Sequence, residues 1–359
     1  METASKSPLE CLRPGTTPDP LGRFGTLCAA AGRTRDAVEI GSIFQDIAGG
    51  LTHTVPTPGS GRTLARWRVL ADIAASSLPL VKLVEGHLDA VAILHELNLW
   101  SEVQPRDIWA VWCAEPPGMR VAAVIDDTEV PCRARVSGIK PWCSGAASVT
   151  RALVSVWNPR GQPCLAAVDM DAPGVRLGEG WHAVGMGPTA SVDVEFDNVP
   201  AVLIGEPGAY VQRPGFLHGA AGVAACWYGA CAAIAEAVRR GARRRPDDAH
   251  ALAHLGAIDI KLAQAASQMR SCAAAIDADP GQPHARAVWR ARLAVEDAAQ
   301  AVLERAPRAL GPSPFCKDPS LAGLLADLPI YLRQSHGERD LAAHGRALIE
   351  ATETAPWTL

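Results

Sequence analysis

Two side chains near the middle of the chain have the types and the spacing to hold a flat aromatic ring. Trp142 and Ser144 are two residues apart in the segment Val136–Ala146, which reads VSGIKPWCSGA. On an extended strand, residues i and i+2 project to the same side, so the indole and the hydroxyl would share one surface. An indole can cover the face of a large planar ring, and a hydroxyl beside it can reach heteroatoms at the ring edge. Taken alone, the pair also fits a core tryptophan and a turn serine.

Other reactive patterns in the sequence are weaker. His250 and His254 are four residues apart on a segment with helical periodicity, but the glutamate that accompanies such a pair in zinc hydrolases is absent. Ser137–Lys140 has the letters of a serine nucleophile motif, yet it lies in a strand context and does not open a helix. The ten cysteines include no C-x-x-C pair. The sequence therefore predicts no metal site.

The hydrophobic pattern divides the chain into three parts. Residues up to about 34 are rich in Pro, Gly and Thr and predict a partly ordered arm, and apolar residues at helical spacing predict helices at 64–73 and 80–94. Short apolar runs between turns, and a final alternating run, then predict strands at 108–113, 121–125, 152–156, 164–168 and 191–199. Helical spacing returns at 220–240, 252–276, 285–303 and 321–332.

These elements predict an α+β fold. We assign 1–107 to an N-terminal arm and helical domain, 108–205 to a central β-barrel-like domain, and 206–359 to a C-terminal four-helix bundle. The net charge of −4 gives no reason to expect nucleic acid, and the sequence has no run of about eighteen uninterrupted apolar residues to span a membrane. Since the N-terminal segment lacks the pattern of a signal peptide, a cytoplasmic location is the expectation.

Four stretches of the sequence resemble motifs of the acyl-CoA dehydrogenase superfamily. Val111–Gly118, which reads VWCAEPPG, is similar to the family's strand and TEPG segment beside the flavin ring. Val136–Ala146 resembles its G-x-K-x-W-[IV]-[ST]-N-[AG] motif. Trp181–Pro200 resembles the GMR…F-D-V-x-VP ending of its β domain, and Ala326–Ala342 resembles its R-D-A-x-x-x-x-I-Y-E-G-T segment. The chain thus looks like a divergent member of this superfamily.

The resemblance implies a binding site for one FAD. Trp142 and Ser144 match the positions that lie beside the flavin, and Cys113, Ala114 and Glu115 match the segment that runs along it. Ala114 stands where the family has a threonine, so one usual hydroxyl contact to the flavin is missing. The resemblance also implies a homodimer or homotetramer.

The catalytic base is the point at which this sequence departs most from the family. The family's glutamate, which removes the substrate α-proton, falls on Ser335 in the ungapped register or on His336 after a shift of one residue. Glu338 is the nearby carboxylate, but its offset rotates it away along a helix. A second family position for the base falls near Gly219, where only His218 is available. We take His336 as the first candidate, because a neutral imidazole accepts a proton near neutral pH.

The sequence therefore predicts an FAD-dependent oxidoreductase. The expected reaction is α,β-dehydrogenation of an acyl thioester carried by CoA or an acyl carrier protein, with a flavoprotein or reductase as the electron partner. The missing glutamate leaves two alternatives open. One is a flavin-dependent monooxygenase of the same fold, which needs no α-proton base, and the other is a catalytically degenerate flavin-binding subunit that stabilises an active homologue.

Overall fold

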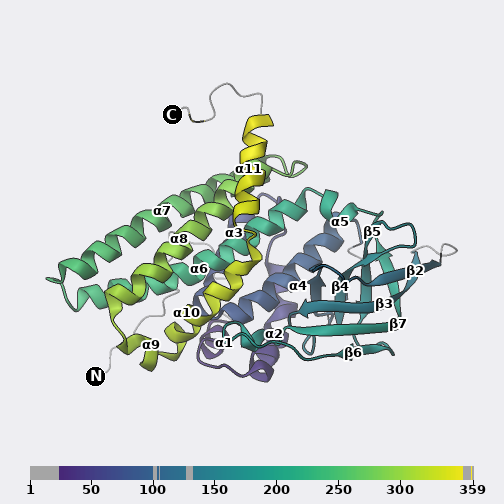
Figure 1. Ribbon diagram of the computed structural model, residues 1–359, viewed down its shortest axis with the longest axis horizontal. Coiled ribbons are helices and arrows are strands. Elements are labelled where there is room, and N and C mark those ends of the chain that lie inside the picture. The colour runs from purple at the N-terminus through teal and green to yellow at the C-terminus, as the bar shows by residue number, and fades with distance from the viewer. Residues whose placement is uncertain (1–23, 100–102, 105, 127–131, 351–356, 358–359) are drawn as a thin grey trace.

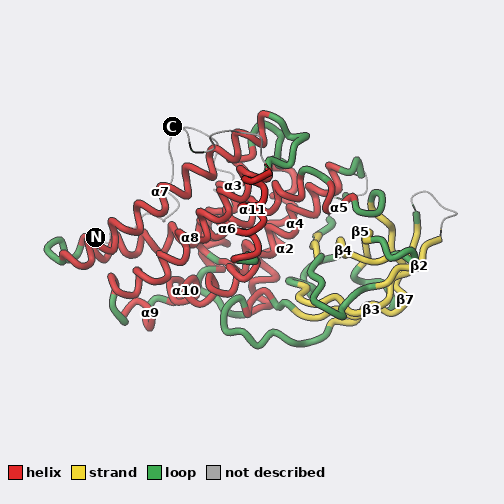
Figure 2. The backbone as a smooth tube through the Cα atoms, turned by 45° about the horizontal axis from the view of Figure 1, so that its top comes forward, coloured by secondary structure: helices red, strands yellow, loops and turns green. Residues whose placement is uncertain are grey.

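Helices occupy both ends of the described part of the chain, and strands lie between them (Figure 1). The computed structural model describes residues 24–99, 103–104, 106–126, 132–350 and 357. Within the described chain, every strand falls between Trp109 and Ile204. Figure 2 shows the strands gathered at one end of the molecule and the helices filling the rest.

In the described residues before the first strand there are four helices, two more than were predicted from the sequence. They are α1 (Gly25–Ala31), α2 (Ala37–Thr54), α3 (Thr63–Ser76) and α4 (Leu78–Glu96). Most of the partly ordered arm predicted up to about residue 34 lies outside the described residues, and its described end contains α1, whose Cys28 is fully buried. A seven-residue helix is too short to be stable alone, so packing against the core decides its conformation. The start of α2 follows a local rule, because the Asp36 carboxylate accepts hydrogen bonds from the amides of Val38 and Glu39.

The strands form one sheet that closes on itself. Its strands are β1 (Trp109–Trp112), β2 (Ala122–Asp126), β3 (Arg133–Cys143), β4 (Arg151–Trp157), β5 (Pro163–Asp169), β6 (Val175–Leu177) and β7 (Val192–Ile204). The order is β1-β4-β2-β3-β7-β5, and β6 pairs with β7. Because β4 also pairs with β5, the strands β4, β2, β3, β7 and β5 form a ring. Residues 152–156 and 164–168 are buried at every position, as expected for strands covered on both faces.

The C-terminal part is helical. It contains α5 (Ala209–Gln212), α6 (Gly215–Arg243), α7 (Ala249–Ala278), α8 (Ala285–Leu310), α9 (Ser313–Lys317), α10 (Pro319–Tyr331) and α11 (Glu338–Glu350), with the short 3-10 turn η4 (Leu332–Gln334). A second 3-10 turn, η3 (Gly187–Thr189), lies between β6 and β7. Helices α6, α7 and α8 pack on one another, and α3 from the N-terminal part packs on α6. An 18-residue window of α6 is apolar enough to cross a membrane, but 67% of that window is buried inside the fold, as in the core helix of a globular protein.

A buried histidine joins the helical part to the sheet. His87 on α4 is fully buried, and its Nδ1 accepts a hydrogen bond of 3.0 Å from the amide of Trp109 on β1. The Nε2 atom therefore carries the proton and donates to the Thr52 hydroxyl on α2 at 2.7 Å. Burial lowers the pKa of His87 to about 4, so the imidazole is neutral in the folded protein.

This pKa predicts a loss of stability in acid. Between pH 6.5 and pH 4 an unfolded histidine binds a proton that folded His87 does not bind, so the free energy of unfolding falls as the pH falls through this window. The full loss from this group is about 3 kcal/mol. Urea unfolding at a series of pH values should show a shallower decline for His87→Gln than for the wild type. Parallel declines in the two proteins would contradict this role.

Candidate functional site

A cavity of about 760 Å³ brings together most of the residues that the sequence singled out. Its walls come from the end of β1, the turn after β3, α4, the start of α6, and the segment that follows α10. This volume is typical of sites for small molecules and cofactors. Five of the predicted site residues line it: Trp142, Ser144, Cys113, Ala114 and His336. Burial raises the pKa of the Cys113 thiol to about 11, so this sulfur faces the cavity as a neutral group.

A bulge in β3 presents the indole of Trp142 to the cavity. The pairing of β3 with β7 shifts register between Lys140 and Cys143, and Trp142 adopts a φ of 57°. A left-handed conformation costs a residue with a side chain about 1–2 kcal/mol. Pro141 and Cys143 are buried on either side, while Trp142 is 56% exposed. Such strain persists where the surrounding structure imposes it, and it is common at functional sites.

Three hydroxyl groups form a chain that ends at the cavity. The Ser144 Oγ lies 2.7 Å from the Ser191 Oγ, which lies 2.8 Å from the Thr189 Oγ1. The Thr189 hydroxyl in turn donates to the carbonyl oxygen of Met186 at 2.7 Å. The amide of Gly145 donates to the Thr189 carbonyl at 2.8 Å, which ties the two segments together. Sequence analysis identified Ser144 but missed its partners, which are 45 and 47 residues away.

A glycine allows this turn to press against α4. Gly145 has a φ of +71°, and a Cβ at this position would lie 2.7 Å from the Cδ2 of Leu83. A side chain would therefore be strained in its backbone conformation and would collide with the helix. In the family motif that this segment resembles, the corresponding residue is an asparagine. The close approach accounts for the glycine at this position.

Glu115 faces the interior of the β domain and does not line the cavity. Its carboxylate accepts hydrogen bonds from the Ser155 hydroxyl at 2.6 Å and from the Trp157 indole at 2.9 Å, and the fully buried Lys140 Nζ lies 3.3 Å away. Burial alone would raise the pKa of Glu115, but these hydrogen bonds and the lysine charge outweigh it and lower the pKa. The Lys140 Nζ also donates to the Ala114 carbonyl at 3.5 Å. Lys140 and Glu115 thus fix the end of β1 from behind the cavity wall.

Among the three residues considered for the catalytic base, the structure brings only His336 to the cavity. Its Nδ1 lies 3.3 Å from the Asp340 Oδ1, and its amide donates to the Asp340 Oδ2 at 3.0 Å. The Ser335 hydroxyl instead donates to Glu296 on α8 at 2.5 Å. Glu338 is the first residue of α11 and is not a lining residue. His336 and Asp340 therefore form an imidazole and carboxylate pair at the rim.

Charged residues on α4 line the inner part of the cavity, and sequence analysis missed them. Lys82, Glu85 and Asp89 all lie on its wall. The Lys82 Nζ is 2.7 Å from the Glu85 Oε2, and the buried Arg66 Nη2 is 3.2 Å from the Asp89 Oδ1. Burial raises the pKa of Glu85, against the opposing effect of the Lys82 charge. The signal was present in the sequence, because these charges recur at helical spacing within an otherwise apolar segment that includes Leu88.

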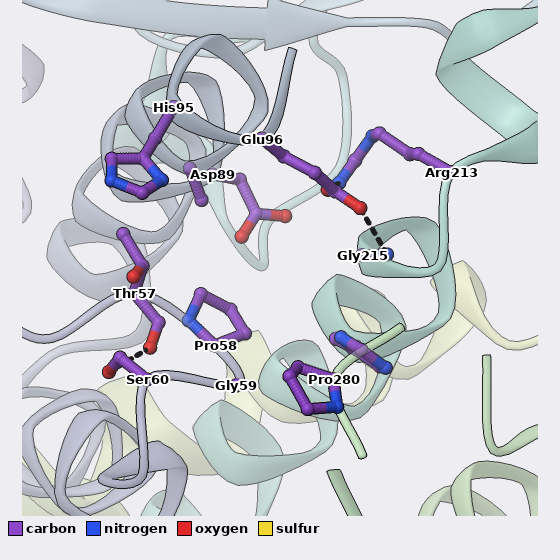
Figure 3. Close-up of a pocket in the computed structure, with 12 residues that line it drawn as sticks. Thr57, Pro58, Gly59, Ser60, Asp89, His95, Glu96, Arg213, Gly215 and Pro280 are labelled. Carbon is purple, nitrogen blue, oxygen red and sulfur yellow. Dashed lines mark hydrogen bonds and ion pairs between the residues drawn. The ribbon is translucent and has the colours of Figure 1, made fainter. Parts of the chain in front are cut away.

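A second, smaller pocket of about 220 Å³ adjoins the inner end (Figure 3). Asp89 and Arg213 line both spaces. Figure 3 shows Asp89 and His95 projecting from α4 toward the loop that contains Thr57. Glu96 is bound by the Arg213 Nη1 at 2.8 Å and by a backbone amide at the start of α6. The inner end of the site is therefore polar on both sides of Asp89.

Comparison with known proteins identifies the fold. No family model matches the chain, and no curated protein matches its sequence. Among solved structures, butyryl-CoA dehydrogenase from Megasphaera elsdenii superposes with a TM-score of 0.77 at 14% identity, covering 94% of this chain and 100% of that chain. KijD3 in complex with FMN and dTDP-3-amino-2,3,6-trideoxy-4-keto-3-methyl-D-glucose has a TM-score of 0.75 at 20% identity, covering 93% of each chain.

A third similar structure is TdsC from Paenibacillus sp. A11-2 with FMN and indole. Its TM-score is 0.68 at 17% identity, and the match covers 88% of this chain and 96% of that chain. The three matches span nearly the whole length of both partners, so they compare complete folds and not a shared helical or β segment. The order of helices, closed sheet and helices, together with these matches, shows that the chain has the fold of the acyl-CoA dehydrogenase superfamily.

Proposed function

We propose that this protein is a flavin-dependent monooxygenase that acts on a polar small molecule. In this proposal the flavin ring lies against Trp142 and Ser144, and the substrate occupies the inner part of the cavity. The observation on which the proposal mainly rests is the charged wall of Lys82, Glu85 and Asp89. Two of the similar structures contain FMN with a ring-bearing substrate or ligand, an amino sugar nucleotide in KijD3 and indole in TdsC.

The residues present fit a flavin. A half-exposed indole offers one flat face, and Ser144 offers a hydroxyl at its edge. Cys113 and Ala114 continue the same wall along β1. When bound, a flavin supplies two electrons, and the chain supplies a shaped and partly dry cavity around it. FAD is the form that the family resemblance implies, whereas FMN is the flavin in the two structures named above.

The charged inner wall disfavours an aliphatic acyl chain. A methylene chain packed against Lys82, Glu85 and Asp89 would remove water from these groups and return no hydrogen bonds. A substrate with hydroxyl, amine or carbonyl groups would replace the lost water contacts. The polar lining of the adjoining pocket extends this preference beyond Asp89. The substrate is therefore expected to carry several hydrogen-bonding groups.

The atoms and electrons of the proposed reaction balance if a separate enzyme supplies two electrons to the flavin. One oxygen atom of O2 enters the substrate and the other leaves as water, while the reduced flavin gives up two electrons and becomes oxidised. A flavin reductase partner would restore the reduced form. No residue has to remove an α-proton, which agrees with the absence of a carboxylate at Ser335 and Gly219, where the related dehydrogenases place their base.

The test starts from the purified protein. The absorbance spectrum after titration with FMN and with FAD, and mass spectrometry of any flavin released on denaturation, show whether and which flavin binds. The flavin is then reduced without oxygen and mixed with dissolved O2, and in parallel the oxidised protein is mixed with butyryl-CoA. Rapid reoxidation by O2 with no bleaching by butyryl-CoA supports the proposal. A protein that binds neither flavin contradicts it, and one that binds flavin but reacts with neither O2 nor butyryl-CoA favours the degenerate flavin-binding subunit.

Acyl thioester dehydrogenation is the second candidate, and the His336–Asp340 pair favours it. His336 lines the cavity and could accept the substrate α-proton while the β-hydride passes to the flavin. Asp340 would hold the imidazole in position.

If this candidate is correct, His336→Gln should lower the rate of flavin bleaching by butyryl-CoA by about 100- to 10,000-fold. Asp340→Asn should lower the same rate less. His344→Gln, on the same helix as Asp340, is the matched control and should retain the rate. A wild-type protein that butyryl-CoA does not bleach removes this candidate, and an unchanged rate in His336→Gln removes His336 as the base.

A further inference from the structure

The direction of the hydroxyl chain can be derived one bond at a time. A carbonyl oxygen can only accept a hydrogen bond, so the Thr189 hydroxyl donates its single proton to Met186. In the bond between Thr189 and Ser191, the donor must then be Ser191. That bond uses the only proton of Ser191, so in the next bond the donor must be Ser144. Every proton in the chain therefore points along the cavity wall toward Met186 and away from the Ser144 end.

This order makes Ser144 a hydrogen-bond acceptor toward the cavity. Its proton lies on the Ser191 side, and only oxygen lone pairs face the space beside Trp142. The arrangement is held firmly, because Thr189 is 1% exposed and Ser191 is 4% exposed. Reversing the chain would break the hydrogen bond from the Thr189 hydroxyl to the buried Met186 carbonyl at 2.7 Å and leave that oxygen only the bond from the Thr189 amide at 3.0 Å. The backbone of Ser144 is also fixed, since its carbonyl accepts from the Trp112 indole at 3.2 Å.

The oxidised and reduced states of a flavin differ in the hydrogen-bond donors and acceptors that they present to a hydroxyl oxygen acting as an acceptor. At the edge where the ring exchanges electrons, the N5 and O4 atoms of oxidised flavin both accept hydrogen bonds. Reduced flavin carries a proton on N5 and donates one. An acceptor facing oxidised N5 or O4 places lone pair against lone pair, whereas the same acceptor facing reduced N5 makes a hydrogen bond.

We infer that Ser191 and Thr189 are positioning residues that orient the Ser144 hydroxyl, so that the cavity binds reduced flavin more tightly than oxidised flavin. This inference rests on the proposed function, because it requires a flavin beside Ser144. It deepens that function by identifying the form in which the flavin arrives. The reaction that precedes this one is then the two-electron reduction of a flavin by a separate enzyme, and oxidised flavin is released after turnover.

The experiment compares affinities for the two redox states and does not depend on turnover. Dissociation constants for oxidised and reduced FMN and FAD are measured by titration, the reduced forms without oxygen, and the midpoint potential of the bound flavin is measured independently. In the wild type we expect reduced flavin to bind about tenfold more tightly or better, which raises the two-electron potential by about 30 mV relative to free flavin. Ser191→Ala frees the Ser144 proton to turn toward the cavity, so the ratio of the two constants should fall severalfold, mainly through tighter binding of oxidised flavin.

Two further variants test the chain itself. Thr189→Val removes the hydroxyl that fixes the direction and should lower the ratio as Ser191→Ala does. Thr189→Ser keeps a hydroxyl at the same position and should retain the wild-type ratio. Equal affinity of the wild type for the two redox states would overturn the inference alone, as would an unchanged ratio in both Ser191→Ala and Thr189→Val. A wild-type protein that binds no flavin in either state would overturn the proposed function as well.

Discussion

Replacing Trp142 with alanine is expected to lower the affinity for flavin by about 10- to 100-fold. The indole is the large flat surface on the cavity wall beside Ser144, and stacking of an aromatic side chain on a planar heterocycle is worth about 1–3 kcal/mol. Trp142 lies in the bulge of β3, between the paired residues Lys140 and Cys143, so its indole is not part of the regular pairing with β7. We therefore expect removal of the indole to leave the backbone of Lys140 and Cys143 unchanged. Titration of the variant with FMN and FAD, with quenching of flavin fluorescence as the readout, measures the loss of affinity.

Two control variants make this result specific. Trp142→Phe keeps an aromatic face and should retain most of the affinity. Trp357 is 82% exposed and does not line the cavity, so Trp357→Ala should bind flavin as the wild type does. If Trp142→Ala also binds flavin with wild-type affinity, the ring does not lie on this wall.

Replacing Lys140 with methionine is expected to lower the free energy of unfolding by about 3–5 kcal/mol. Lys140 is fully buried, and its ammonium group is surrounded by Glu115, the Ser155 hydroxyl at 2.8 Å and the Ala114 carbonyl. Methionine fills a similar volume but leaves the Glu115 carboxylate without its cation. Urea unfolding, monitored by circular dichroism, measures the decrease in the free energy of unfolding.

The size of this effect should depend on Glu115. In the double variant Lys140→Met with Glu115→Gln, no uncompensated carboxylate remains, so the loss should be smaller than the sum of the two single losses. Lys261→Met breaks an exposed ion pair with Asp297 whose 2.7 Å separation is shorter than the 3.3 Å between Lys140 and Glu115, yet it should cost less than about 1 kcal/mol. Equal losses for Lys140→Met and Lys261→Met would mean that burial does not strengthen the pair at Glu115.

The order of elements was predictable because it depends on local patterns. Apolar residues at helical spacing indicated the helix at 80–94, and the structure extends it to 78–96 as α4. Ile40, Ile43, Phe44, Ile47 and Leu51 recur at the same helical spacing, so α2 could also have been predicted. The periodicity did not reveal α1, which owes its conformation to packing of Cys28 in the core. A short helix with few residues per turn on the apolar face gives too weak a pattern to separate from a loop.

Within the candidate site, proximity in sequence decided what could be predicted. Trp142 and Ser144 both line the cavity, and the resemblance of their segment to a known motif predicted a flavin ring beside them. Regular strand alternation does not explain their shared surface, because Trp142 lies in the bulge of β3 with a φ of 57° and Ser144 follows the last residue of the strand. Glu115 was also predicted to lie beside the flavin ring, because its neighbours in sequence match the family segment that runs along the flavin. The structure turns its carboxylate inward, because the buried Lys140 requires an anion and Trp157 and Ser155 offer hydrogen bonds beside it.

The sequence by itself determined three parts of this protein: its helix, strand and helix order, the residue types at the end of β3, and the loss of the usual catalytic carboxylate. Tertiary structure alone decided that Ser144 is hydrogen-bonded to Ser191 and through it to Thr189, that His336 reaches the cavity while Ser335 does not, and that the charges of α4 line the cavity. The physical reason is that backbone periodicity acts over a few residues. Hydrogen-bond direction and burial depend instead on the register of β3 against β7 and on the packing of α4 and α6, which join residues far apart in the chain.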